Sequence, residues 1–314
     1  MSEIELHRKL LSDKVRNDAF YAALKKLIKP GATTVADIGA GTGFLSFLAR
    51  KLGARHCTLI EYSEMMQVAE QLADSNRIKS LSFIKGYSPE LRRPLQVDLV
   101  ISETLGNFAL EEGMLETLVD AWRFVGKGGT VMPASLKQFV APVVTSRLQD
   151  EIDIWKDVGF KLDLSAAREV SLNNMYVKTL RAEDLGGSAD HAQQWDAIDF
   201  RPSSQKPSSV RRSTLQWRGQ DLGARLFGYA LWWEVELVAG VSLSTSPFAP
   251  PTHWEQIYLP LLQPLTLQEA DTVELKLTSD TRAESRLRVT WHTRHVRGGR
   301  ALQTQQQDIT NGRI

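Results

Sequence analysis

Residues 35–53 read VADIGAGTGFLSFLARKLG, in which an apolar run leads into a glycine-rich turn and then into a helical pattern. Gly39, Gly41 and Gly43 allow a tight turn between a strand and a helix, and they let a ligand approach the backbone closely. Further apolar, β-rich runs lie at 56–61, 81–85 and 97–102, with helical patterns between them. Strands that alternate with helices predict a parallel sheet with helices on both faces, which is a Rossmann-like, doubly wound α/β fold.

Two further parts of the chain flank this unit. Before it, segment 4–29 carries apolar side chains at helical intervals and ends at Pro30-Gly31, which predicts a helix there. After Gly128-Gly129, short strand-like runs separated by turns predict a mainly antiparallel β-barrel or sandwich. We therefore expect an α/β domain over 1–135, including the N-terminal helix, and a β domain over 136–314. The glutamine-rich tail from Arg297 is expected to be partly disordered.

Composition narrows the class of protein. The chain has 314 residues, a formal net charge of +1 and one cysteine, Cys57. This charge balance argues against general nucleic-acid or membrane binding, which usually shows as a basic excess. A single cysteine forms no internal disulfide and provides no cysteine-rich metal site, so we expect no metal and a reducing, cytoplasmic location. The sequence contains no run of about 18 apolar residues, so we expect no membrane-spanning helix.

The glycine turn has acids at two telling positions. Asp37 precedes the turn, where it would repel a pyrophosphate, and Phe44 stands where a nicotinamide fingerprint has its third glycine. Glu61 ends the second apolar run, where an acid can receive both hydroxyls of a ribose. A cofactor with an ammonium group and no phosphate fits this set, which points to S-adenosylmethionine. A glycine-rich turn without a ligand is the alternative.

Two more carboxylates stand in residues 102–115, SETLGNFALEEGML. Glu103 ends a hydrophobic strand, at the edge of an open α/β sheet where ligands bind. If Glu112 folds back across the loop, two like charges share one pocket and favour a cation between them, and a planar guanidinium pairs well with carboxylates. Held in this way, the guanidinium would be polarised and aimed at a methyl donor. The alternative is a solvated loop whose acids, Glu111 included, stabilise a helix start.

With PTHWEQIY at 251–258 added, the chain resembles the protein arginine N-methyltransferase family over nearly its whole length. The motifs that carry the resemblance are DIGAGTG, the acid of LIEYS, the double-glutamate loop and the Thr252-His253-Trp254 loop. The resemblance implies an α/β methyltransferase sheet followed by a β-barrel. It also implies a homodimer that forms through a helical arm, here at about 155–188.

The resemblance further implies roles for individual residues. Glu103 and Glu112 would clamp the guanidinium, and His253 would pair with Asp13 to complete the catalytic set. The expected cofactor contacts are His7, Arg16 (with the cofactor's carboxylate), Asp37, Gly39, Gly41, Gly43, Glu61, Glu90 and Met114. Trp254 would form a wall of the arginine pocket, and Thr104 and Asn107 would shape its rim.

The chain departs from the common pattern at several of these places. Thr104, Leu105 and Asn107 replace a Trp, a Met and a Tyr, and Glu90 stands one position after the usual adenine-site acid. The chain also starts after the family's usual tyrosine-rich first helix, as in a short bacterial-type member. We expect methyl transfer to an arginine of a protein or peptide. Free arginine or a small guanidine metabolite is the alternative substrate, and a non-catalytic binding protein is the alternative class.

Overall fold

The computed structural model describes residues 2–202 and 206–313. Two helices, α1 (Glu3–Ser12) and α2 (Lys14–Leu27), precede a five-stranded parallel sheet with the strand order β3-β2-β1-β4-β5. The strands are β1 (Thr34–Ile38), β2 (His56–Glu61), β3 (Leu81–Lys85), β4 (Val97–Ser102) and β5 (Val125–Met132). Helices α3 (Phe44–Lys51), α4 (Met65–Ser75) and α5 (Met114–Ala121) connect them and pack on the sheet. The predicted doubly wound α/β fold is confirmed.

Three of the acidic residues predicted to form the site lie at the carboxyl ends of three neighbouring strands. β1 lies between β2 and β4, so the ends of these strands form one edge of the sheet. Asp37 lies near the end of β1, Glu61 ends β2, and Glu103 directly follows β4. The parallel register therefore brings together carboxylates that are up to 66 positions apart in the printed sequence.

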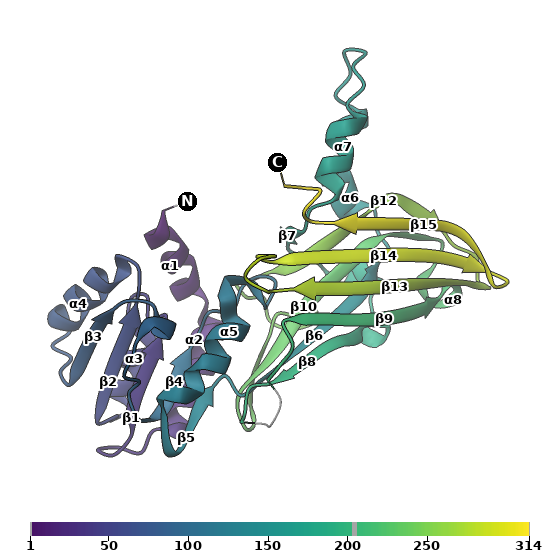
Figure 1. The fold of residues 1–314 in the computed structure, drawn as a ribbon. Coiled ribbons are helices and arrows are strands. Elements are labelled where there is room, and N and C mark those ends of the chain that lie inside the picture. Colours follow the sequence, from purple (N-terminus) through teal and green to yellow (C-terminus); the bar gives the residue numbers. More distant parts are fainter. Residues whose placement is uncertain (1, 203–205, 314) are drawn as a thin grey trace.

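The second half of the chain forms two antiparallel sheets that make a barrel-like domain (Figure 1). One sheet has the order β7-β12-β10-β6-β8, with β11 beside β10, and the other has the order β15-β14-β13-β9. The strands of this domain are β6 (Ser135–Val143), β7 (Tyr176–Lys178), β8 (Gln193–Asp199), β9 (Val210–Arg218), β10 (Arg225–Val238), β11 (Val241–Ser244), β12 (Gln256–Thr266), β13 (Asp271–Asp280), β14 (Arg288–Arg297) and β15 (Arg300–Asp308). The short helix α8 (Gly219–Leu222) follows β9. Buried Tyr229 on β10 meets Thr293 on β14 at 3.0 Å between hydroxyl oxygens, which links the two sheets across the core.

A helical arm stands out from this barrel-like domain (Figure 1). It contains α6 (Arg147–Ile152), the 3-10 turn η4 (Ile154–Lys156) and α7 (Ser165–Leu172). Its tip exposes large apolar side chains: Phe160 is 88% exposed and Leu162 is 65% exposed. Apolar side chains gathered at the end of a projection indicate a surface that another molecule covers.

The carboxyl-terminal tail differs from the expectation of disorder. From Arg297 the chain turns through Gly298 and Gly299, both with positive φ, and β15 pairs with β14 as a hairpin. The inward-pointing glutamines find buried backbone partners, for example Gln307 Nε2, which donates to the carbonyl oxygens of Leu172 (3.0 Å) and Pro260 (2.6 Å). The expectation of disorder was wrong because it rested on the polarity of the tail. It did not consider the hydrogen bonds that the glutamine side-chain amides form in the folded chain.

The remaining short elements are 3-10 turns in connecting segments. They are η1 (Ser88–Glu90), η2 (Glu111–Gly113), η3 (Trp122–Phe124), η5 (Ala182–Leu185) and η6 (Ala189–His191). Within 2–202 and 206–313, no helix is long and apolar enough to span a bilayer, and no three His, Cys, Asp or Glu side chains gather as a metal site.

Candidate active site

The glycine turn is held open by its backbone. Gly39, Gly41 and Gly43 all have positive φ, at 72°, 51° and 78°. The amides of Gly39 and Ala40 donate to the carbonyl oxygen of Ile60 on β2, at 2.9 and 3.2 Å. A Cβ on Gly39 would lie 3.1 Å from Thr104 Cγ2, so the turn leaves no room for side chains at this point. The backbone is therefore exposed to whatever occupies the edge of the sheet.

Asp37 is almost completely buried beneath this turn. Its Oδ2 accepts a hydrogen bond of 2.7 Å from the hydroxyl of Ser46, a residue on α3 that the sequence analysis did not single out. Burial raises the pKa of Asp37 to about 6, since hydrogen bonding from Ser46 only partly offsets the loss of water. A buried carboxylate of this kind is well suited to an ammonium group, which would compensate its charge.

Glu61 fixes the opposite side of the turn. Its Oε2 accepts from the backbone N–H of Gly41 at 2.9 Å, and its Oε1 accepts from the N–H of Ser63 at 2.8 Å. The side chain is buried and faces the glycine turn, as a ribose-binding acid requires. Its expected contact with ribose stays a prediction.

Helix α1 lies over the glycine turn. A Cβ on Gly41 would come within 2.3 Å of His7 Cε1, so the imidazole rests directly on the glycine. Beneath it remains a cavity of about 50 Å³, lined by His7, Leu10, Arg16, Asp37, Gly39, Ala40, Gly41, Thr42, Phe44, Leu45 and Glu103. The structure thus brings together most of the predicted cofactor residues. This space is much smaller than the cofactor, so the residues fit the cofactor chemically but must separate to admit it.

Glu103 holds a guanidinium that belongs to the chain itself. Arg16, in the first turn of α2, donates to Glu103 Oε2 from Nε at 2.9 Å and also from Nη2. Both side chains are buried, with 4% and 5% exposed, and the Arg16 guanidinium lies 5.2 Å from the ring centroid of Phe20. The resemblance implied that Arg16 contacts a cofactor carboxylate, and neither the resemblance nor the sequence pattern predicted this pair, whose partners are 87 positions apart.

Glu112 is the second acid of the predicted clamp. It has a φ of 58°, which is unusual for glutamate, and its side chain is exposed. Its pKa is raised, first by the loss of water among surrounding protein atoms and then by the negative charges of Glu103 and Glu111. The negative charge of Glu103 therefore makes ionisation of Glu112 less favourable, although the two residues are nine positions apart. A strained backbone at such a residue is typical of functional positions.

Glu111 has a different part in the loop. Its Oε2 accepts from the backbone N–H of Phe108 at 3.2 Å, and the side chain packs over Gly106. Burial raises the pKa of Glu111. Glu111 therefore braces the loop through a hydrogen bond to its backbone, whereas Glu112 is exposed.

His253 and Asp13 meet as the resemblance implied. Asp13 Oδ2 accepts from the backbone N–H and from the ring Nδ1 of His253, both at 2.8 Å. Asp13 also separates α1 from α2 and caps α2 by accepting from the N–H of Arg16 at 2.9 Å. Burial opposes ionisation of Asp13, but the hydrogen bonds from His253 and Arg16 outweigh it, so the pKa of Asp13 is lowered. The expected single helix over 4–29 is therefore two helices, joined at a residue tied to the barrel.

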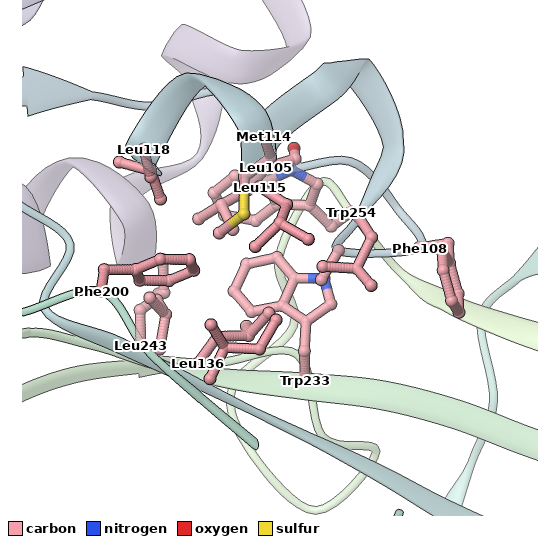
Figure 2. Close-up of a cluster of buried hydrophobic side chains, with 14 of the residues drawn as sticks. Leu105, Phe108, Met114, Leu115, Leu118, Leu136, Phe200, Trp233, Leu243 and Trp254 are labelled. Atoms are coloured by element: carbon pink, nitrogen blue, oxygen red, sulfur yellow. Dashed lines mark hydrogen bonds between the residues drawn. The ribbon is translucent and has the colours of Figure 1, made fainter. Parts of the chain in front are cut away.

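Trp254 and Met114 lie in the core where the two domains meet (Figure 2). Trp254 is 3% exposed, and its Nε1 donates to the carbonyl oxygen of Leu105 at 2.5 Å. Its ring packs edge-on against Trp233, with 4.9 Å between centroids. Asn107 Nδ2 donates to the carbonyl oxygen of Trp254 at 2.5 Å. These residues tie the double-glutamate loop to the barrel, and their expected contacts with ligands stay predictions.

Glu90 and Thr104 are the remaining predicted residues. Glu90 is exposed at the end of η1 and lies outside the cavity lining. Thr104 follows Glu103, and its hydroxyl is buried without a hydrogen-bond partner among the described residues. The predicted adenine contact of Glu90 and the predicted rim position of Thr104 both stay predictions.

Comparison with known proteins identifies the family. A model described as the arginine methyltransferase oligomerization subdomain matches residues 134–294, and a methyltransferase domain model matches residues 29–186. The chain belongs to the protein arginine methyltransferase family. The prediction of an S-adenosylmethionine-dependent arginine methyltransferase is thereby confirmed at the level of the family.

Individual relatives of this arginine methyltransferase are distant but long matches. Protein arginine N-methyltransferase 6 of Xenopus tropicalis is 29% identical over 284 residues, covering 85% of this chain and 81% of the relative. Protein arginine N-methyltransferase 1 of Saccharomyces cerevisiae is 28% identical, covering 87% and 79%. The fold is similar to that of the Trypanosoma brucei PRMT1 enzyme–prozyme heterotetrameric complex with AdoHcy, with a TM-score of 0.82 and 24% identity over 97% of this chain and 98% of that one.

Proposed function

We propose that this methyltransferase acts on the guanidinium of an arginine side chain in a protein or peptide, held between Glu103 and Glu112. The observation that carries the proposal is the binding of a guanidinium, that of Arg16, by two donors to Glu103. The site therefore has the geometry for the group on which it would act. Glu112 lies near enough for its pKa to respond to the charge of Glu103.

The residues around the glycine turn would hold S-adenosylmethionine. Asp37 would face its ammonium group, Arg16 its carboxylate and Glu61 its ribose, while Gly39 and Gly41 allow close approach of the backbone. When bound, the cofactor supplies a methyl group on a positively charged sulfur. The proposed cytoplasmic location rests on the buried, free Cys57, which suits a reducing compartment.

The two glutamates would orient and polarise the substrate. Buried Glu103 would fix one edge of the guanidinium plane, and the exposed Glu112 would contact the group from the open side. Holding the positive charge near the carboxylates leaves more electron density on the nitrogen that receives the methyl group. Methylation releases one proton from that nitrogen, and Glu112, whose pKa is raised, is suited to accept it. His253 and Asp13 would position α2 and thus Arg16.

The arm and a groove on the α/β domain suit each other as the contact between two copies of the chain. The groove has a volume of about 290 Å³ and lies between α1, α3 and α4. Its lining is mainly apolar: Leu11, Thr42, Phe44, Phe47, Leu48, Lys51, Leu72, Asn76 and Ile78. The arm tip offers Phe160 and Leu162 of matching character. We infer a homodimer in which each arm occupies the groove of the other copy.

Transfer of a radiolabelled methyl group tests the proposed reaction. The acceptors are an arginine–glycine peptide and free arginine, and the enzymes are wild type, Glu103→Gln and the matched control Glu111→Gln. We expect label on the peptide, a loss on the order of 10²-fold or more in Glu103→Gln, and a smaller effect of Glu111→Gln because Glu111 braces the loop without facing the substrate. Transfer that is unaffected by Glu103→Gln would refute the clamp.

The same assay separates the alternatives. Label on free arginine but not on the peptide would favour a small guanidine substrate. Binding of S-adenosylhomocysteine without transfer to any acceptor would favour a non-catalytic binding protein.

A further inference from the structure

We propose that Arg16 is an internal occupant of the clamp, so that an arginine substrate binds only after the methyl donor has bound. The inference rests on the proposed function of Glu103 and adds an order of binding to it. It starts from the pair between Arg16 and Glu103, which the proposed reaction itself does not require.

Arg16 uses Glu103 as a substrate would. Its Nε and Nη2 both donate to Glu103 Oε2, while Nη1 donates to Asn17 Oδ1 at 3.0 Å. The other oxygen, Glu103 Oε1, accepts from the backbone N–H of Leu105 at 3.3 Å. A bidentate pair with a second guanidinium needs the oxygen that Arg16 already engages. The substrate therefore cannot pair with both oxygens of Glu103 while Arg16 remains there.

The same arrangement closes the cofactor site. His7 rests on Gly41, and only about 50 Å³ remains beneath α1. Helix α1 buries none of its own residues, and it joins α2 at the non-helical residue Asp13. Arg16 lies three positions beyond this joint. A displacement of α1 about Asp13 that admits the methyl donor therefore occurs next to Arg16.

The carboxylate of the methyl donor gives Arg16 another partner. When Arg16 turns to that carboxylate, one buried ion pair is exchanged for another, so the guanidinium never loses its counter-charge. Glu103 is then left buried and unpaired, close to the charge of Glu112. That state is costly unless a cation arrives, and the substrate guanidinium supplies one. Binding of the donor thereby prepares the clamp for the substrate, and the coupling between the two ligands is reciprocal.

Calorimetric binding of S-adenosylhomocysteine to the full chain tests the competition for Arg16 without any substrate. Glu103→Gln should bind it about tenfold more tightly than wild type, because Arg16 no longer has to leave a carboxylate. Glu112→Gln removes the same charge from the clamp but does not free Arg16, so its affinity should change less. Methylthioadenosine, which lacks the carboxylate, should bind wild type and Glu103→Gln equally.

Two outcomes of this titration would overturn the proposal. One is weaker or unchanged binding of S-adenosylhomocysteine to Glu103→Gln. The other is an equal gain in Glu112→Gln, which would show a general charge effect. Neither depends on methyl transfer, so the result can be told apart from failure of the proposed function.

A second measurement follows a fluorescent arginine–glycine peptide by anisotropy. In wild type, saturating S-adenosylhomocysteine should tighten peptide binding by about tenfold or more, whereas methylthioadenosine should not. Arg16→Met should bind the peptide without S-adenosylhomocysteine about as tightly as wild type binds it with S-adenosylhomocysteine, because Glu103 is already free in this variant. The control Arg8→Met, on the exposed face of α1, should behave as wild type. Thermal unfolding verifies that Arg16→Met is folded. Peptide binding to cofactor-free wild type as tight as to its complex would contradict the proposed order.

Discussion

At the scale of one residue, the buried charge of Asp37 lowers the stability of the fold and provides a partner for the ammonium group of the cofactor. Asp37 is buried, its Oδ2 accepts a hydrogen bond from Ser46, and among residues 2–202 and 206–313 no cation forms a bidentate pair with it. Its pKa of about 6 lies above the ordinary value near 4. Between these values the folded chain keeps a proton that the unfolded chain has lost. The free energy of unfolding therefore falls as pH rises through this window, and the loss is complete above about pH 6.

We expect Asp37→Asn to be more stable than wild type at pH 7.5, by up to about 3 kcal/mol, and to lose this advantage towards pH 4. Urea unfolding at pH 4.5 and 7.5 measures the effect. The control Asp98→Asn should be less stable than wild type at pH 7.5, because hydrogen bonds from Thr34 lower the pKa of Asp98. Equal effects of Asp37→Asn at both pH values would contradict the argument. Asp37→Asn should also bind S-adenosylhomocysteine more weakly than wild type, since it lacks the charge that would face the ammonium group.

Glu112 carries strain of another kind. Its φ of 58° suits asparagine better than glutamate, and Glu103 and Glu111 repel its charge. We expect Glu112→Asn to raise the free energy of unfolding by roughly 1 kcal/mol while methyl transfer falls by on the order of 10²-fold. Thermal unfolding and the transfer assay measure the two effects together. A variant that loses both stability and activity would show that the loop is not strained.

At the scale of elements, the contact between α1 and the glycine turn decides whether the site is covered. Gly41→Ala would place a methyl group 2.3 Å from His7 Cε1, at a φ of 51° that alanine adopts poorly. We expect α1 to be displaced, S-adenosylhomocysteine to bind at least about tenfold more weakly, and α1 to be cleaved faster by protease. His7→Ala in the same chain should restore part of the affinity, because it removes the clash but not the backbone strain. Additive losses in the double variant would exclude the contact.

The same elements show what the sequence could predict. The glycine turn, the strand ends and the two glutamates follow from local pattern and topology, so the fold and four cavity-lining residues could be predicted from them: Asp37, Gly39, Gly41 and Glu103. The family resemblance added His7 and Arg16. The break at Asp13 could not, because the helical pattern continues across it and the partner that fixes it, His253, is 240 positions away. The pair between Arg16 and Glu103 could not be predicted either, because its partners are also far apart in the sequence. The tail was misjudged because glutamines that look solvated in the sequence fill buried hydrogen-bonding positions in β15.

At the scale of the whole molecule, the proposed docking groove and the cofactor cavity are neighbours. Thr42, within the glycine turn, and Phe44, directly after it, line both. An arm that fills the groove would therefore restrict the turn and α1 at the same time. Assembly of two copies is expected to support cofactor binding as well as to bury the apolar arm tip.

We expect Phe160→Glu to be monomeric and to bind S-adenosylhomocysteine more weakly, because a charge on the arm tip cannot enter an apolar groove. Light scattering after size-exclusion chromatography gives the mass, and calorimetry gives the affinity. The control Leu302→Glu changes an equally apolar but distant side chain on β15, 49% exposed, and should remain dimeric. A dimeric Phe160→Glu would show that the arm tip is not the contact.

Mixing two variants that are both expected to transfer methyl groups more slowly than wild type extends this prediction to the direction of docking. Phe160→Glu has an intact clamp but a defective arm, whereas Glu103→Gln has an intact arm but a defective clamp. If each arm occupies the groove of the other copy, the arm of Glu103→Gln can dock on Phe160→Glu and support its clamp. The mixture should then transfer methyl groups faster than the sum of the two variants measured alone, and the gain should rise with the concentration of Glu103→Gln. No gain, although mixed dimers form, would mean that each arm supports only its own chain's site.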